Sequence, residues 1–513
     1  MKIKGAVTLT CLAFAVSMAQ AQVEVRSEAQ LTASDGEHAP LWLNANKHGL
    51  SSTDKTSGYV RAGIFKDFAQ DSTHQWRYGF GADVAVATGF TSTVVVQQAF
   101  ADVAWRKGLL TLGSKERHLE LKDDELSSGS QTLGINARPV PGAKLSFPDY
   151  VVIPGTKHWL SFKGHLFYGI TTDDSWQKEF TERRHKYTEH TMLHTKAGFI
   201  KIGKAEKPLS VEMGLEMGCQ YGGDTYCPDN INLPHIENEG GLSGMFRAFV
   251  PGGWEASDHV DYHNEMGNHV GSWTARINLD YKRWGLSVYA DHFFEDQSQM
   301  FFLDYDGYGT GEKWDSWEHF NWMLYDLRDI QLGLELRLKQ CKWVDKVVAE
   351  YLYTMYQSGP IYHDHTRTIS DHIGGLDHYY SHSIYSGWQH WGQVMGNPLY
   401  RSPIYNDNKL VEVDDSRFSA WHIGISGAPA SGLRYRLLAT WQKGFGTYIR
   451  PYIEPRKNVS LLAEAYYHFP EGSALGGWSV NGAFALDRGK LLGDNTGVQL
   501  TIGKRMEIKK KNK

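Results

Sequence analysis

Apolar and polar residues alternate along many stretches of this chain. In the clearest stretch, 329–340, every second residue is apolar and the intervening positions carry Gly or polar and charged side chains. The apolar positions are Ile330, Leu332, Leu334, Leu336 and Leu338. Because side chains alternate between the two faces of a β-strand, this pattern predicts a strand with one apolar and one polar face.

The same alternation recurs in fifteen other segments, which brings the number of readable strands to roughly 16. The segments are 59–68, 76–86, 94–105, 108–113, 158–170, 190–203, 209–219, 273–281, 284–294, 347–355, 418–426, 433–441, 459–469, 478–486 and 498–502. Most are about 8 to 13 residues long, whereas strands of globular proteins centre on about 5 or 6. A tilted strand needs about 9 to 11 residues to cross a bilayer, so the lengths favour membrane-spanning strands.

The two faces of these segments differ in composition. The polar faces are rich in Gly, Ser, Thr and charged residues, and aromatic residues often stand at the ends of the apolar stripes. A wet lumen inside and lipid outside produce this pattern, with aromatic girdles where the bilayer meets water. We therefore expect an all-β fold: a transmembrane antiparallel β-barrel of about 16 to 18 strands, in contact with outer-membrane lipid.

The start of the chain predicts export. Lys2 and Lys4 precede an apolar run that ends in the small-residue cleavage site Ala19-Gln20-Ala21, which is typical of a signal peptide. Cleavage would release the mature chain at Gln22, destined for the outer membrane of a Gram-negative bacterium. The predicted divisions are a signal peptide (1–21), a small N-terminal periplasmic segment or plug with helical character (22–58), the barrel with long loops (59–505) and a basic C-terminal tail (506–513).

Four connections between the predicted strands are far too long for tight turns. They are 114–157, 222–271, 295–328 and 357–417. Simple alternation through the readable strands does not place all four on one side of the membrane, which indicates a strand pair hidden in at least one of them. Long loops of this kind lie outside the cell or fold into the lumen, so we expect them to carry the function.

The loops also carry a set of motifs that resembles a known family. The motifs stand at 127–130, 133–141, 264–273, 374–380, 385–392 and 396–399. Together with the signal peptide and the barrel pattern, they resemble the capsule assembly Wzi family in its Bacteroides-type form, from about Pro40 to the last strand. The resemblance implies an outer-membrane barrel of about 18 strands with helical material near its periplasmic end. It also implies a lectin that helps attach capsular polysaccharide, with capsule export machinery as a further partner.

A saccharide site needs flat apolar ring faces and hydrogen-bonding groups. Residues 362–391 are rich in aromatic side chains with polar tips, which suit such a half-wet contact. The candidate saccharide-binding residues are Tyr379, Tyr380, Tyr385, Trp388, Trp391, Asn136 and Arg138. The alternative for the aromatic residues is that they pack the loop against the barrel wall. The alternative for Arg138, whose guanidinium can fork onto a carboxylate, is that it ties its loop to a barrel acid.

The cysteine and histidine patterns indicate one candidate disulfide and no metal site. Cys219 and Cys227 are spaced for a candidate disulfide in an oxidising compartment, and no Cys-x-x-Cys occurs. Six histidines lie between residues 363 and 390, but none of their spacings matches a His-based zinc motif. The acidic loop at 304–307 departs from the EF-hand pattern of calcium ligands. We therefore expect no cofactor and no metal.

Composition and motifs argue against two other classes of function, nucleic-acid binding and catalysis. The chain has 53 Lys and Arg against 58 Asp and Glu, a net charge of −5 that argues against a nucleic-acid partner. It lacks Gly-x-Ser-x-Gly, a phosphate-binding Gly-rich loop and His-Glu-x-x-His, so we expect a protein that is not an enzyme. The favoured function is binding of capsular or surface polysaccharide and its attachment or assembly at the cell surface. The alternative is a porin or substrate-selective channel.

Overall fold

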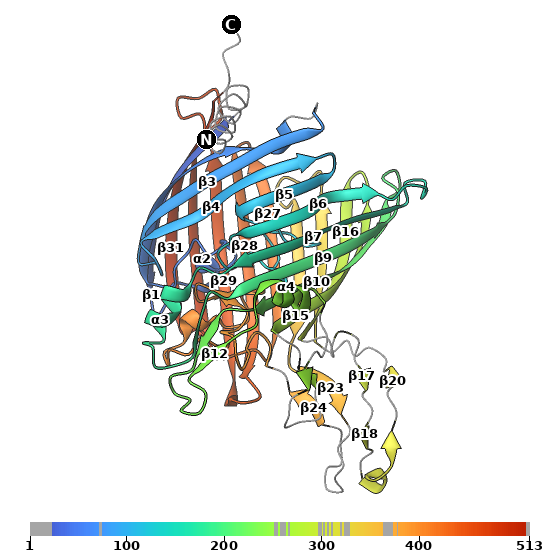
Figure 1. Cartoon of the computed structure of the whole chain (residues 1–513). Helices are drawn as coiled ribbons and strands as arrows, with labels where there is room; N and C mark the ends of the chain where they lie inside the picture. Colours follow the sequence, from blue (N-terminus) through green and yellow to red (C-terminus); the bar gives the residue numbers. More distant parts are fainter. Residues whose placement is uncertain are drawn as a thin grey trace, which may run out of the picture.

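The computed structural model describes residues 23–508, apart from 71–73, 251–254, 257–262, 265–266, 296–299, 301–302, 305–306, 309–310, 319–320, 323–328, 363–372 and 377. Eighteen strands form one antiparallel sheet that closes into a barrel (Figure 1). Each strand pairs with the next barrel strand along the chain, and the first pairs with the last.

The barrel strands are β1 (Val23–Asp35), β2 (Thr56–Lys66), β3 (Trp76–Thr88), β4 (Val94–Trp105), β5 (Gly108–Ser114), β6 (Gly142–Val152), β7 (Leu160–Ile170), β9 (Met192–Ile202), β10 (Leu209–Tyr221), β15 (Asn268–Asp280), β16 (Trp284–Glu295), β21 (Ile330–Leu338), β22 (Lys346–Tyr353), β27 (Phe418–Ala430), β28 (Leu433–Gly446), β29 (Pro451–His468), β30 (Trp478–Gly489) and β31 (Asn495–Ile508).

The apolar faces of the strands point outward, as the alternation predicts. In β21, Leu332 and Leu334 are 46% and 42% exposed, whereas Gln331 and Glu335 on the lumen face are 0% and 5% exposed. Exposed apolar side chains continue around the barrel in an outer belt: Val60, Val84, Val86, Val96, Leu112, Leu145, Ile200, Met213, Ile277, Val288, Leu437, Phe484, Val498 and Leu500. The expected transmembrane barrel of 18 strands is therefore confirmed.

The alternation of apolar and polar residues does not predict two of the barrel strands, β1 and β6. β1 lies inside segment 22–58, which was expected to precede the barrel, so the prediction is wrong for residues 23–35. Ser27 and two alanines interrupt the apolar stripe on the outward face of β1. β6 lies inside the expected loop 114–157, where Pro148 and a register shift between Phe147 and Val151 break the alternation. Adding β1 and β6 to the readable strands completes the eighteen.

The added strands also explain the sidedness of the loops. Connections 115–141, 222–267, 296–329 and 354–417 now all leave the same rim of the barrel, which we name the long-loop rim. The opposite rim, named the terminal rim, carries short turns such as 106–107 and both described ends of the chain (Figure 1). This is the asymmetry of bacterial outer-membrane barrels, whose periplasmic turns are short and whose extracellular loops are long.

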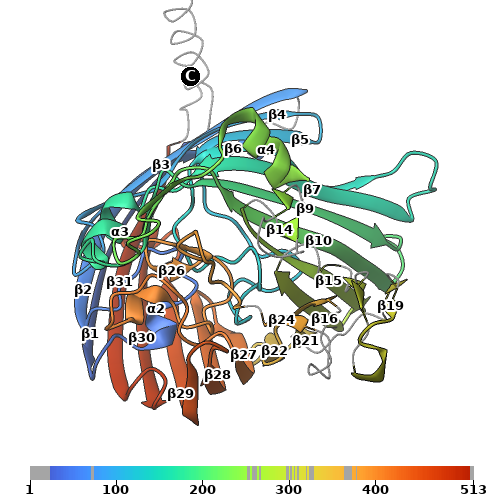
Figure 2. The same ribbon diagram turned by 60° about the horizontal axis from the view of Figure 1, so that its bottom comes forward.

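Three segments fold into the lumen and form what we name the plug: 36–55 with α2 (Leu41–Asn44), 115–141, and 378–417 with β25 (Gln389–His390), β26 (Gln393–Val394) and the 3₁₀ turn η3 (Pro403–Tyr405). Figure 2 looks into the barrel past these segments. Buried plug side chains such as Trp42, Leu133 and Trp388 share one apolar core with Phe293 and Phe418 of the wall. Helix α2 therefore belongs to the plug and follows the long-loop end of β1.

Smaller elements decorate the long-loop rim (Figure 1). They are α3 (Asp174–Phe180), the sheet of β8 (Tyr187–Glu189), β11 (Asp224–Tyr226) and β12 (His235–Glu237), α4 (Gly241–Phe249), the pair β13 (Glu255–Ala256) and β14 (His263–Asn264), the sheet of β17 (Leu303–Asp304), β20 (Asn321–Trp322), β23 (Ser358–Tyr362) and β24 (Ile373–Leu376), and the pair β18 (Gly307–Tyr308) and β19 (Trp317–Glu318). No helix within the described ranges has the length and apolar character to cross a bilayer.

The structure bears on the predicted C-terminal tail but not on the predicted signal peptide. The signal peptide 1–21 and residues 509–513 lie outside the described residues. Residues 506–508, which the composition predicts to be part of the basic tail, belong to β31, where they pair with β1. The barrel therefore extends further toward the C-terminus than the composition of the tail indicates.

Candidate functional site

Four of the five aromatic residues predicted to stack on sugars are buried in the plug core. Tyr379, Tyr380, Tyr385 and Trp388 are all 3% exposed or less. Tyr380 donates its hydroxyl proton to the backbone carbonyl of Gln131, and Trp388 Nε1 donates to Thr132 O at 2.8 Å. The three tyrosine rings are packed against protein, so in this arrangement they are unavailable to a sugar. Trp388 is equally buried but borders a cavity between the plug and the wall, which is described below. The alternative, that they pack the loop against the barrel, describes them better.

Asn136 and Arg138 hold plug segments together. Asn136 accepts a hydrogen bond from Asn46 N at 3.0 Å and donates to Val394 O at 3.1 Å, so it joins all three plug segments. Arg138 donates to the hydroxyls of Thr91 and Ser92 at 2.7 and 2.9 Å. The acceptors of Arg138 are neutral, so the alternative, a tie from this loop to a barrel carboxylate, is wrong. Burial lowers the pKa of Arg138 to about 10.

Trp391 is the most accessible of the predicted aromatic residues. Its ring lies beside the Arg138 guanidinium, and its Nε1 donates to Thr172 Oγ1 at 3.2 Å. Of the predicted site residues, Arg138 and Trp391 are a pair that the structure brings into direct contact. The pair bridges the plug and the loop that precedes α3.

The predicted histidines that the structure describes are structural. His378 and His390 bond the backbone carbonyls of Val413 and Arg138, and His382 Nδ1 accepts from two backbone N–H groups. Burial lowers the pKa of His382 to about 3, which keeps its ring neutral. Within the described ranges, no group of three or more His, Cys, Asp or Glu is placed to hold a metal. His363, His365 and His372 lie outside those ranges.

The candidate disulfide is not formed. The side chains of Cys219 and Cys227 are both reduced. Cys219 is buried in β10 with its Sγ 3.3 Å from His269 Nε2, whereas Cys227 follows β11 in the rim loop. The spacing along the chain therefore does not translate into a bond, because Cys219 lies in the barrel wall and Cys227 in the rim loop after β11.

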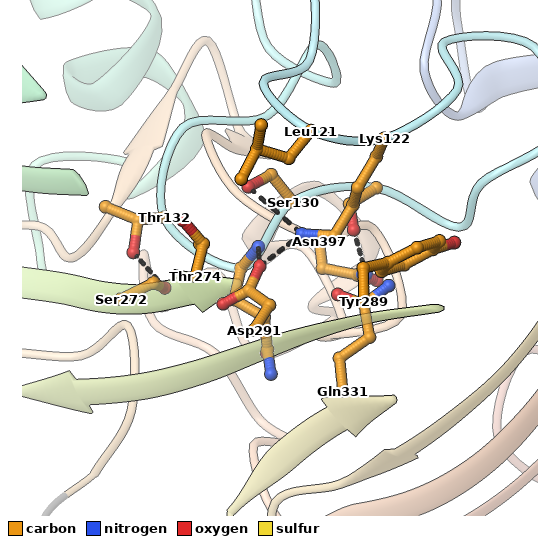
Figure 3. Close-up of polar contacts among 12 residues, drawn as sticks. Leu121, Lys122, Ser130, Thr132, Ser272, Thr274, Tyr289, Asp291, Gln331 and Asn397 are labelled. Carbon is orange, nitrogen blue, oxygen red and sulfur yellow. Dashed lines mark hydrogen bonds and ion pairs between the residues drawn. The ribbon is translucent and has the colours of Figure 1, made fainter. Parts of the chain in front are cut away.

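Charged lumen residues tie the plug to the barrel wall (Figure 3). Lys122 forms an ion pair with Asp291 of β16, and both side chains are almost fully buried. Asp291 also accepts the backbone N–H of Gln131 at 3.1 Å. Nearby, Thr132 bonds Ser272 of β15 at 2.6 Å. Sequence reasoning missed this network, although the acid at a lumen-facing position of a membrane strand was a usable signal.

One candidate binding feature is a cavity of about 380 Å³ between the plug and the wall, which we name the lumen cavity. The wall side is formed by β5, β6, β7 and β9, and the plug side mainly by 115–120 and 133–140. Its volume falls in the range of about 300 to 1,000 Å³ typical of small-molecule sites.

The lining of the lumen cavity is strongly basic. Five cationic side chains stand against two carboxylates: Lys115, Arg117, Arg138, Lys144 and Lys163 against Glu116 and Glu120. Three of these cations have partners, because Lys115 pairs with Asp102, Lys163 pairs with Glu120, and Arg138 is bonded as described above. Arg117 and Lys144 make no hydrogen bond or ion pair with any residue that the structure describes.

Sequence reasoning missed both of these cations. Lys144 belongs to β6, the strand hidden by the Pro148 bulge, so its lumen-facing position could not be assigned. Arg117 lies in a loop without regular pattern. Burial lowers the pKa of Arg117 below its ordinary value, and the nearby carboxylates of Glu216 and Glu120 offset part of that effect.

A closed 18-stranded antiparallel barrel whose own loops fill part of its lumen defines a class of large transmembrane β-barrels. Among solved structures, the chain is similar to Wzi of Escherichia coli, described as an outer-membrane protein involved in group 1 capsule assembly and a carbohydrate-binding β-barrel. The two share 13% identity and a TM-score of 0.54, over 97% of this chain and 87% of Wzi. No family model and no curated protein matches the chain.

Two Pseudomonas aeruginosa structures are further matches. OccK5 (OpdH) has 9% identity and a TM-score of 0.45, over 96% of this chain and 99% of its own. OprD has 10% identity and a TM-score of 0.43, over 96% and 98%. At such identities the likeness to Wzi shows a shared barrel fold.

Proposed function

We propose that this protein is a non-catalytic outer-membrane barrel that binds capsular or other surface polysaccharide and helps attach or assemble it at the cell surface. The long-loop rim would face the outside and the terminal rim the periplasm, where capsule export machinery would meet it. The fold likeness to Wzi, itself described as a carbohydrate-binding barrel of capsule assembly, supports this choice among outer-membrane roles.

The observation that carries the proposal is the packed plug. A channel needs a continuous wet path, whereas here three loop segments share an apolar core with the wall across the lumen. Buried ion pairs and hydrogen bonds fix the plug to β10, β15 and β16. A lumen that folded protein partly fills suits retention of a ligand better than diffusion of solutes.

The alternative is the substrate-selective channel, and conductance separates the two functions. Purified protein in a planar bilayer should give no steady open-channel current if the plug stays folded. A steady current from the unmodified protein would favour the channel and count against the polysaccharide-binding function.

The direct test uses the native strain. Deleting the gene should release capsular polysaccharide into the medium, and the wild-type gene supplied in trans should restore it to the cell surface. The purified barrel should bind the polysaccharide of the same strain, and an unrelated 18-stranded porin prepared in the same detergent is the control. Unchanged capsule retention in the deletion strain, together with no measurable binding, would overturn the proposal.

A further inference from the structure

The lumen cavity holds two cations, Lys144 and Arg117, that form no direct ion pair or hydrogen bond within the described part of the chain. Lys144 projects from β6 and Arg117 from the plug, and the two lie close enough in the cavity for their charges to repel each other. Burying a cation without a partner costs free energy, and two cations facing one space cost more. Such an arrangement is expected where a negatively charged ligand completes the site.

The acids around the cavity are already engaged elsewhere. Asp102 accepts from Lys115 and from Thr111, and Glu120 from Lys163. Glu116 accepts from the Gln97 amide at 2.8 Å. Glu216, which also acts on Arg117 through its charge, accepts from Ser130 at 3.1 Å. None of these carboxylates bonds Arg117 or Lys144, so the positive charge remains directed into the cavity.

The rest of the lining suits a sugar. Thr111, Ser146 and Thr195 place hydroxyl groups on the wall side, where Thr111 donates to Asp102 at 2.6 Å and Thr195 bonds His165 Nε2 at 3.2 Å. The hydroxyl oxygens keep lone pairs that can accept a hydrogen bond from a sugar. Val140, which is half-buried, offers apolar surface that can cover the C–H face of a pyranose, and the buried side chains of Leu133 and Phe167 lie behind the cavity lining. A guanidinium binds a planar carboxylate through two parallel hydrogen bonds, and a neighbouring ammonium adds a third.

We propose that the lumen cavity binds an anionic sugar unit whose acidic group lies between Arg117 and Lys144. This inference rests on the proposed polysaccharide function and names the chemical class of its ligand. The anion is supplied by a carboxylate, as in a uronic acid, or by a phosphate ester on the sugar.

Titration calorimetry of the full-length barrel in detergent tests the inference. The probes are oligogalacturonate, glucose 6-phosphate, a neutral gluco-oligosaccharide and inorganic phosphate. Either anionic sugar should bind at least about tenfold more tightly than the neutral one, because only the anion can form charge-assisted hydrogen bonds with the half-buried Arg117 and Lys144. The anionic sugar that binds more tightly shows whether the acidic group is a carboxylate or a phosphate ester. Equal affinity for neutral and anionic sugars, or binding of inorganic phosphate alone, would overturn the proposal.

Two substitutions assign the site. Lys144→Met and Arg117→Gln should each weaken binding of the anionic sugar about tenfold or more and leave the neutral sugar unaffected. Lys204→Met, in the short turn between β9 and β10 and outside the cavity, should bind as the parent does. Unchanged affinity in both cavity variants would overturn the proposal.

Thermal unfolding separates a lost ligand contact from a damaged fold. Because Lys144 is unpaired, Lys144→Met should melt at or above the temperature of the ligand-free parent. A lower melting temperature would mean that Lys144 supports the wall and would contradict its assignment as an unpaired ligand-binding cation. Binding of capsular polysaccharide without preference for charge would overturn this inference and leave the proposed function standing, whereas no glycan binding at all would remove both.

Discussion

The guanidinium carbon of Arg138 lies 4.4 Å from the ring centroid of Trp391. The same guanidinium donates to Thr91 and Ser92 in the turn between β3 and β4, so a single side chain links two plug segments to the barrel. A cation over an indole ring contributes about 0.5 to 2 kcal/mol, depending on how far it is desolvated. This contact therefore acts as a clamp on the plug.

Replacing Arg138 should loosen that clamp. Arg138→Met keeps the aliphatic part of the side chain but removes the hydrogen bonds and the charge, which should lower the free energy of unfolding by about 1 to 3 kcal/mol. Urea titration of the barrel in detergent measures this loss. Arg183→Met, at an exposed loop position, is the control and should change stability little. A variant of Arg138 as stable as the control would contradict the clamp.

The buried pair Lys122–Asp291 should be sensitive to removal of one partner. Lys122→Met leaves the Asp291 carboxylate buried without its cation and should destabilise the plug by about 3 to 5 kcal/mol. We expect faster proteolysis of loop 115–141 and the appearance of conductance in planar bilayers.

The double variant Lys122→Met with Asp291→Asn is the matched control for that experiment. It removes both charges and keeps an acceptor for the Gln131 N–H, so it should recover part of the lost stability. If the double variant is no more stable than the single one, the ion pair is not the reason for the loss.

Asp415 should make the stability of the plug depend on pH. Burial raises the pKa of this plug carboxyl to about 7, and the backbone N–H groups of Gly446 and Phe445 offset part of the effect. The native state therefore holds a proton that the unfolded chain releases above about pH 4. Stability from this group is full at low pH and is lost as pH rises from about 4 to 7, with a slope of up to about 1.4 kcal/mol per pH unit.

The measurement for Asp415 is a comparison of two unfolding profiles. Asp415→Asn cannot ionise and can still accept the Gly446 N–H, so its stability should fall less than that of the parent across this window. The difference between the two curves isolates Asp415 from other titrating groups, such as His382. Parallel curves would contradict the raised pKa.

Leu334 tests the outward register of β21. Leu334 faces the outer belt, so Leu334→Arg should cost about 2 to 4 kcal/mol if the position lies near the bilayer midplane. Folding into lipid vesicles, followed by the heat-dependent shift in gel mobility, measures the effect. Leu334→Val keeps an apolar side chain and serves as the control. Insertion of Leu334→Arg at the parental yield would contradict the register.

The barrel could be predicted because lipid imposes a strict alternation on each strand. β21 follows the alternation without interruption, whereas β1 and β6 lose it to small or polar outward residues and to the bulge after Phe147. The plug could not be predicted in the same way. Tyr380 and Trp388 have the composition of a sugar platform, but their burial depends on contacts with residues far away in the sequence. Arg117 and Lys144 converge only after both the hidden strand and the loop are placed.

The pairing of β1 with β31 has a consequence for biogenesis. Val23 is the partner of Ile508, so the wall cannot close until almost the whole chain has been delivered to the membrane. Until then the sheet has two open edges, which are sites for mispairing and aggregation. Segment 36–55 follows β1 directly, but its helix α2 packs on β29, β30 and β31, so it reaches its final place only once those last strands are present. Sealing of the wall and burial of the N-terminal plug segment are thus coupled late events of assembly.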